Sequence, residues 1–180
     1  MSKNADAIRV RIKKNPLPNC NVRTNMVSIK GSVEVKALPE KVWSIISDVD
    51  RESRYWNGLK SARVRKREGN VIEREVEVGF MGHTGHQIVK LNPQSSTIDI
   101  EMIDGPLVGS RNLKLVPLQT GAKTRLEASW NFSFSNVPMF AKGFVKSQIE
   151  RVTKDALEKI ALEAEGKEPS SEVVVVSSSR

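Results

Sequence analysis

Several residue types on which common active sites and scaffolds depend are scarce in this chain of 180 residues. Cys20 is the only cysteine, which excludes an intramolecular disulfide framework and any zinc or iron-sulfur site made of several thiolates. No apolar run reaches the roughly 18 to 20 residues of a membrane-spanning helix, and the first residues contain no secretory signal. The length suffices for one domain with tails, and we expect this domain to be soluble and cytoplasmic.

Catalytic motifs are scarce as well. The sequence has no GxSxG elbow, no phosphate-binding glycine loop, no HExxH motif and no catalytic Cys-His signature. The two histidines, His83 and His86, could both reach a metal, but no third ligand lies nearby and their glycine-rich turn favours hydrogen-bonded loop residues. We therefore expect no catalytic residues, no cofactor and no metal, and a binding protein rather than an enzyme.

The positive charge is distributed unevenly. With 29 Lys and Arg against 21 Asp and Glu, the net charge is +8, which favours a nucleic acid or an anionic membrane as partner. Residues 1–25 contribute +5 and the segment 51–67 contributes +6, so the rest of residues 26–165 is slightly acidic. The pattern predicts a basic, mostly disordered arm over 1–25, a folded domain over 26–165 and a disordered tail over 166–180.

Alternating apolar and polar residues predict seven strands. The strands cover residues 27–36, 60–68, 71–80, 84–91, 96–103, 109–118 and 123–134. Short turns rich in glycine, asparagine, aspartate and proline separate the last six. Consecutive strands with such short connections pair in the antiparallel sense.

Helical spacing of apolar residues predicts the remaining elements. Pro39 begins a short helix, and residues 48–57 form a second short helix or turn. An apolar stripe marks a long helix from Asn136, its expected N-cap, to Glu165, with Pro138 just inside. The order of elements predicts an α+β fold in which a strongly curved, seven-stranded antiparallel sheet wraps around the long C-terminal helix, with two short helices after the first strand.

The inner face of such a sheet is larger than one helix covers, which predicts a ligand cavity, although a fully packed core has the same periodicity. Arg74, Arg111 and Gln148 fall in phase with the apolar residues. If buried, they are polar anchors for a ligand carboxylate, carbonyl or hydroxyl; at a strand end, they reach water instead. The candidate ligand-binding residues are Arg74, Val76, Val78, Phe80, Ile100, Met102, Arg111, Leu113, Trp130, Phe132, Phe140, Phe144 and Gln148.

Three basic residues alternate along one face of a predicted strand: Arg63, Arg65 and Arg67. Together with the basic arm, they could contact the phosphates of RNA, of the ribosome or of a membrane surface. The next strand carries a row of carboxylates: Glu73, Glu75 and Glu77. The alternative is therefore an edge strand whose arginines pair with this row across the hairpin, and we favour this interpretation.

Several short motifs resemble those of one superfamily. They are Val33 to Trp43 (VEVKALPEKVW), Ile46-Ser47-Asp48, Tyr55-Trp56, the turn Asp104-Gly105-Pro106-Leu107, Leu113-Lys114-Leu115 with Pro117, and Thr124 leading into Trp130 and Phe132. In this order they are similar to the SRPBCC, or START-like helix-grip, superfamily. Within it, the sequence most resembles the polyketide cyclase/dehydrase and lipid transport group, which includes coenzyme Q-binding START proteins.

The resemblance covers about residues 26–162 and implies a deep hydrophobic cavity under the last helix, closed by loops near 104–109 and 135–138. It supplies no invariant catalytic set, since members of this fold differ in function. The first hypothesis is a non-enzymatic carrier or sensor of a small lipid, isoprenoid or quinone-like ligand. The second is an aromatase/cyclase-like enzyme that polarises a carbonyl through Arg74, Arg111 or His86. The third is a ribosome- or RNA-associated module.

Overall fold

The computed structural model describes residues 26–79, 82–118, 122–135 and 137–167. The expectations for the basic arm, for most of the C-terminal tail, and for Phe80 and Asn136 lie outside the described residues. The elements are β1 (Val27–Val35), α1 (Pro39–Ile46), the 3-10 helix η1 (Val49–Arg54), β2 (Leu59–Glu68), β3 (Val71–Val78), β4 (His83–Asn92), β5 (Thr97–Met102), β6 (Leu107–Pro117), β7 (Thr124–Phe134) and α2 (Met139–Ala164).

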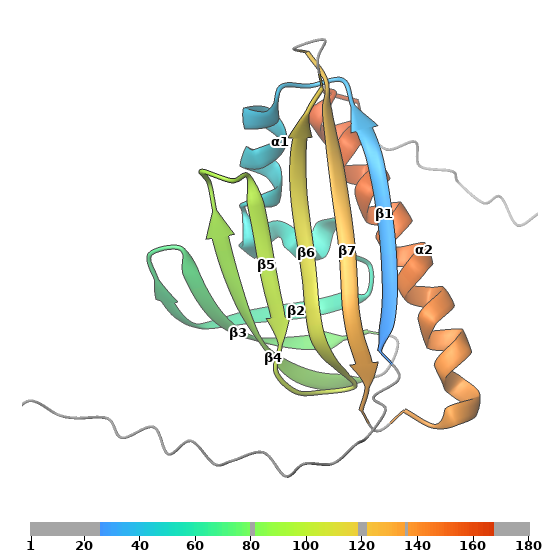
Figure 1. The fold of residues 1–180 in the computed structure, drawn as a ribbon. Coiled ribbons are helices and arrows are strands. Elements are labelled where there is room, and N and C mark those ends of the chain that lie inside the picture. The colour runs from blue at the N-terminus through green and yellow to red at the C-terminus, as the bar shows by residue number, and fades with distance from the viewer. Residues whose placement is uncertain (1–25, 80–81, 119–121, 136, 168–180) are drawn as a thin grey trace, which may run out of the picture.

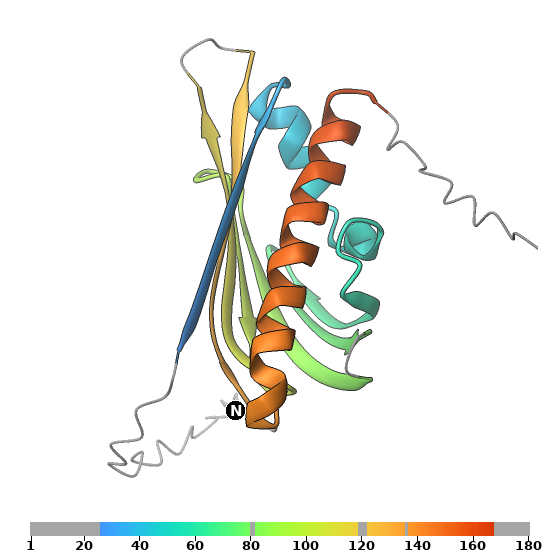
Figure 2. The same cartoon turned by 90° about the vertical axis from the view of Figure 1, so that its right-hand side faces the viewer.

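All seven strands form one antiparallel sheet in the order β1-β7-β6-β5-β4-β3-β2. Figure 1 shows its curvature: β2 and β3 turn well away from the direction of β6 and β7. Figure 2 shows α2 lying along one face of the sheet, with α1 and η1 on the same side. The expected α+β helix-grip architecture, with a curved seven-stranded sheet, two short helices and a long C-terminal helix, is confirmed.

The short helices follow from local sequence. Pro39 occupies the first turn of α1, where its missing N–H costs no hydrogen bond, and Val42 and Ile46 lie one turn apart on the buried face. Tyr55 ends η1 and donates a hydrogen bond from its hydroxyl to Glu163 Oε2 of α2, 2.7 Å away. Burial and this hydrogen bond raise the pKa of Tyr55, so its hydroxyl keeps the proton that joins η1 to α2.

The long helix begins slightly later than its sequence suggests. Pro138 has φ −55° and ψ 145°, an extended conformation, so it precedes α2 as the N-cap residue rather than lying inside the helix. The buried side of α2 recurs every three or four residues, as an amphipathic helix requires. Its buried residues are Val145, Ile149, Thr153, Ala156, Leu157, Ile160, Ala161 and Ala164.

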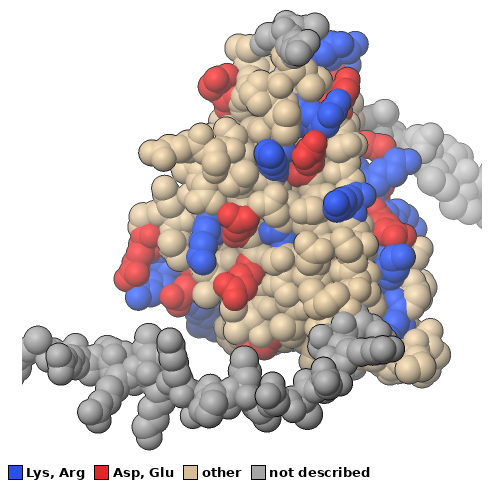
Figure 3. All heavy atoms as spheres, viewed as in Figure 1, with Lys and Arg blue, Asp and Glu red and all other residues tan. Residues whose placement is uncertain are grey.

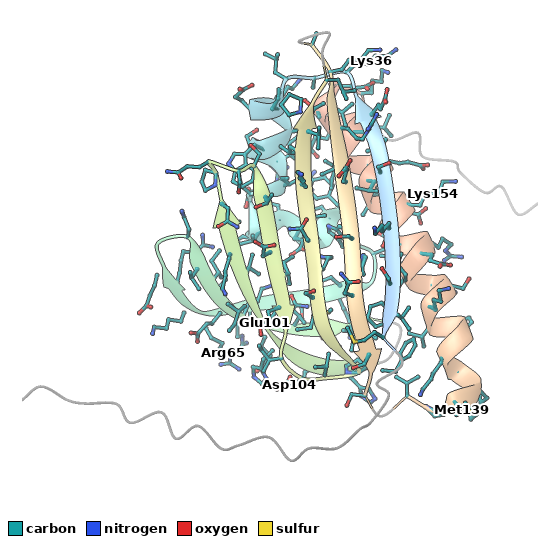
Figure 4. All side chains as sticks on the ribbon, in the orientation of Figure 1. Lys36, Arg65, Glu101, Asp104, Met139 and Lys154 are labelled. Atoms are coloured by element: carbon teal, nitrogen blue, oxygen red, sulfur yellow. The ribbon has the colours of Figure 1, made fainter. Side chains whose placement is uncertain are left out.

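The first turns of α2 depart from the expected apolar stripe. Phe140 and Phe144 are in phase with the stripe, yet 91% and 62% of their surfaces are exposed, and Met139 beside them is 83% exposed. The reason is the path of the helix: α2 diverges from β1 toward its N-terminal end, and Figure 4 shows Met139 at the end that has left the sheet. The sequence-based placement of Phe140 and Phe144 in a cavity lining is therefore wrong.

None of the described helices is both long and apolar enough to cross a membrane.

Candidate functional site

A cavity lies between the sheet and α2, on the inner side of β3 to β7. Its volume is about 70 Å³, and Asp104, whose side chain is 54% exposed, lies at its outer end, so the cavity opens to the surface beside the β5–β6 loop. Its lining consists of Trp56, Gly58, Leu59, Val76, Val78, Gly85, Gln87, Met102, Asp104, Pro106, Leu107, Arg111, Trp130, Ile149 and Val152.

The cavity is much smaller than the deep one that the resemblance implies. Pockets for drug-sized ligands enclose roughly 300 to 1,000 Å³, several times this volume. Trp56 separates the cavity from a second void of about 10 Å³, since it lines both. A ligand of more than a few atoms must therefore displace flexible lining side chains such as Leu59 and Met102.

The structure places the predicted ligand-binding residues in different parts of the fold. Five line the cavity: Val76, Val78, Met102, Arg111 and Trp130. Three others belong to the packed core: Ile100, Leu113 and Phe132. Arg74 is buried in an ion cluster next to the cavity, and Gln148 is half-buried on α2 outside the lining. Phe140 and Phe144 are exposed, and Phe80 lies outside the described residues.

The inner end of the cavity adjoins a buried cluster of three charged side chains. Glu52 of η1 forms ion pairs with Arg74 of β3 and Arg111 of β6. All three residues are buried, with 8%, 2% and 6% of their surfaces exposed. The two arginines therefore do not reach water, the alternative that the sequence left open, and both are polar groups inside the fold.

Further contacts hold the two guanidinium groups in place. Arg74 donates from Nε and Nη2 to Gln87 Oε1 on the neighbouring strand, at 3.1 and 2.8 Å. The guanidinium carbon of Arg111 lies 4.1 Å from the ring centroid of Trp56 and 5.0 Å from that of Trp130, within the range of cation–π attraction. The guanidinium of Arg111 thus lies against both indole rings, which also contact each other.

The charge state of the cluster follows from its geometry. Burial by itself raises the pKa of Glu52, but the guanidinium groups of Arg111 and Arg74 outweigh it and lower the pKa from 4.5 to about 2. Burial lowers the pKa of Arg111 and Glu52 opposes this shift, while an arginine side chain remains protonated in proteins. The cluster therefore contains one negative and two positive charges.

The outer end of the cavity is formed by contacts between β4 and the β5–β6 loop. The backbone N–H of His86 donates to Asp104 Oδ1 at 2.7 Å, and His86 Nδ1 lies 2.8 Å from Asp104 Oδ2. These contacts lower the pKa of Asp104, which remains a carboxylate. Gly85 lets the loop approach, because a Cβ there would lie 2.8 Å from the backbone oxygen of Asp104.

The glycine-rich sequence suggests that His83 and His86 lie in a loop. In the structure, both belong to β4. In the described parts of the chain, no group of three His, Cys, Asp or Glu residues is arranged to hold a metal ion.

The basic strand β2 is an exposed edge strand whose charges are mostly paired. Arg65 forms an ion pair with Glu75 at 2.7 Å, and Lys60 forms one with Glu77 at 2.7 Å, both across the β2–β3 hairpin. Arg67 instead pairs with Asp50 of η1 at 3.1 Å. Figure 3 shows positive and negative side chains side by side on this part of the surface. Of the arginines expected to pair with the carboxylate row, Arg65 does so, whereas Arg67 pairs with η1 instead.

Sequence reasoning missed several residues of the site, and Glu52 most of all. It counted as the one acidic residue in a basic segment. A signal was present, because Arg74 and Arg111 in apolar phase require a buried counter-charge if they do not reach water. Trp56, Gln87 and Ile149 were also missing from the candidate list, although they line the cavity.

Comparison with known proteins places this architecture in a family. A family model described as polyketide cyclase / dehydrase and lipid transport matches residues 26–165. The chain belongs to this family. No curated protein matches the sequence.

Solved structures with the family's architecture share the fold at low sequence identity. The Zhui aromatase/cyclase from Streptomyces sp. R1128 is 16% identical with a TM-score of 0.69, and the match covers 78% of this chain and 94% of that one. A START superfamily protein from Mycobacterium smegmatis is 20% identical with a TM-score of 0.55, covering 77% and 94%. The di-domain aromatase/cyclase StfQ of the steffimycin biosynthetic pathway is 14% identical with a TM-score of 0.65, covering 78% and 52%.

Proposed function

We propose that this protein is a non-enzymatic carrier or sensor of a small, largely hydrophobic ligand in the cytoplasm, of the lipid, isoprenoid or quinone-like class. The observation that supports this function most is the cavity: apolar side chains from β3, β5 and α2 surround it, and a buried guanidinium lies at its inner end. Membership of a family that includes lipid transport agrees with it. Binding without chemistry also agrees with the lack of known catalytic motifs in the sequence.

In this proposal, the ligand enters the cavity beside the β5–β6 loop. The β5–β6 loop, with Asp104 and Pro106 in the lining, borders the open end of the cavity, and Leu107 at the start of β6 lines it as well. The contacts between His86 and Asp104 hold this loop against β4. The ligand enters beside this loop and displaces lining side chains as it does so, which enlarges a space of about 70 Å³.

Filling the cavity tests the proposal. Val152 lines it from α2, so Val152→Phe places a ring in the space, while Val71→Phe is a matched control at an exposed strand end 39% open to solvent. Native mass spectrometry and organic extraction of the purified full chain measure the ligand that co-purifies. We expect wild type and V71F to carry an apolar ligand and V152F to carry at least tenfold less. Equal occupancy in V152F, or no ligand in wild type together with no binding of fatty-acid, quinone or isoprenoid probes, would refute the proposal.

An aromatase/cyclase-like enzyme is the second candidate, favoured by the likeness to two aromatase/cyclases. Arg111 and Trp130 would then donate hydrogen bonds to a substrate carbonyl and polarise it. Turnover of a polyketide probe that survives both Arg111→Met and His86→Ala would exclude these residues from catalysis, and the absence of any turnover would favour the carrier.

A further inference from the structure

Among the residues that the structure describes, the buried ion cluster has one positive charge without a counter-charge. Glu52 is the carboxylate paired with both Arg74 and Arg111. The other polar lining residues do not supply a second one: Gln87 is neutral, and Asp104 lies at the outer end, where it is engaged by His86. Since buried charges in proteins are paired or bind an ion of opposite sign, the cluster is suited to one more anion.

Hydrogen bonding indicates where this anion binds. Among the described residues, four buried side-chain atoms make no hydrogen bond, and two of them, Glu52 Oε2 and Arg74 Nη1, form an ion pair with each other. The other two are donors, Arg111 Nε and Trp130 Nε1. A buried donor without an acceptor is costly, so two such groups at one site point to an acceptor that binds from outside the protein.

Both donors belong to the same place in the fold. Arg111 and Trp130 are directly opposite each other in the β6–β7 register, and directly opposed residues have Cβ atoms about 4.5 to 5.5 Å apart. Both residues line the cavity. Their surfaces are 6% and 9% exposed, so water competes little for the two N–H groups.

We infer that the ligand of this cavity carries a carboxylate, which accepts hydrogen bonds from Arg111 Nε and Trp130 Nε1 and compensates the extra positive charge, with its apolar body among Val76, Met102 and Val152. The inference rests on the proposed function and specifies its ligand as an amphipathic acid rather than a neutral lipid. The present cavity of about 70 Å³ has room for a small head group but not for a drug-sized ligand. The apolar body then occupies the space opened by lining side chains.

Matched probes with one body and different head groups test the inference on the full chain. Decanoate, methyl decanoate and decanol share the alkyl chain and differ in charge and hydrogen bonding. Isothermal titration calorimetry at pH 7.5 measures the three affinities. We expect decanoate to bind at least tenfold more tightly than the ester or the alcohol.

Two variants tie this preference to the two donors. Trp130→Phe keeps an aromatic ring but removes the N–H together with part of the indole, so it should weaken decanoate severalfold and methyl decanoate less, because an ester carbonyl is a weaker acceptor than a carboxylate. Arg111→Met removes the extra charge and leaves Glu52 and Arg74 as a neutral pair, so it should abolish the preference for the acid. Trp43→Phe, a half-buried position on α1 outside the cavity, is the matched control and should change neither affinity.

The outcomes separate this inference from the proposed function. Equal binding of acid, ester and alcohol, or an acid preference that survives both W130F and R111M, overturns the carboxylate while the carrier function stands. Binding of none of the three probes, with no difference between wild type and V152F in co-purified ligand, overturns both. A preference for the acid that is lost in R111M and reduced in W130F, but unchanged in W43F, supports the inference.

Discussion

Replacing Glu52 by Gln is the sharpest test of the buried cluster, because it keeps the size of the side chain and removes its charge. In wild type, the carboxylate separates two buried guanidinium groups and pairs with each. In the variant, Arg74 and Arg111 are buried together without a negative charge. Breaking a buried ion pair by removing one partner costs about 3 to 5 kcal/mol, a large share of the roughly 5 to 15 kcal/mol that stabilises a domain.

The expected loss is easily measured. A change of about 3 to 5 kcal/mol lowers the melting temperature of a domain of this size by about 6 to 20 °C. Urea unfolding followed by circular dichroism at pH 7 gives the free energy of unfolding directly. Glu34→Gln is the matched control, since Glu34 forms an ion pair with Arg125 at 3.0 Å on the surface, where such pairs contribute about 0 to 1 kcal/mol.

The pH dependence of the difference provides a second readout. The pKa of Glu52 is lowered from 4.5 to about 2 on folding, so its contribution is complete above the unfolded value and is lost as the pH falls toward the folded value. The contribution is on the order of 3 kcal/mol at pH 7, of which about 2 kcal/mol is lost by pH 3. The stability gap between wild type and E52Q should therefore narrow between pH 5 and pH 3.

Two results would refute this reasoning about Glu52. One is an E52Q variant no less stable at pH 7 than E34Q. The other is a gap between wild type and E52Q that stays constant from pH 7 to pH 3 while both proteins remain folded.

Two further predictions concern packing. Phe140→Ser should change the free energy of unfolding by less than about 0.5 kcal/mol, because Phe140 is 91% exposed, whereas Phe132→Ala should cost about 3 to 5 kcal/mol, because Phe132 is fully buried; chemical denaturation of both variants checks the path of α2. Gly109→Ala should cost roughly 2 to 5 kcal/mol, since Gly109 has φ +146° and a Cβ there would collide with the backbone of β7 at Asn131. Gly69→Ala, at φ +56° with nothing near its Cβ, should cost only about 1 to 2 kcal/mol, and equal effects of the two substitutions would contradict the close approach of β6 and β7.

The regular elements were predictable because their signals are local. Each strand alternates apolar and polar residues with a period of two, and each turn carries residues that favour a reversal of the chain. Pro39 and the spacing of Val42 and Ile46 likewise predict α1 from signals one helical turn apart. Every boundary of the six consecutive strands therefore lies within a few residues of its expected position.

The sequence-based errors concern which parts of two elements meet in space. Phe140 and Phe144 have the periodicity of the buried stripe, and nothing in the sequence shows that α2 leaves the sheet before reaching them. Ile100 and Leu113 have the same inward phase as the true lining residues, yet they pack against the core beyond Trp56. Periodicity determines which face of an element a side chain occupies, not what that face meets.

By itself, the sequence determined the fold and the burial of an apolar inner face, because both depend on patterns repeated within single elements. Only the tertiary structure decided the chemistry of the site. Glu52, Arg74 and Arg111 come from η1, β3 and β6, and Arg111 is 59 residues from the carboxylate it contacts. Their meeting depends on how the curved sheet brings distant strands to one end of the cavity. There, one carboxylate pairs with two buried guanidinium groups.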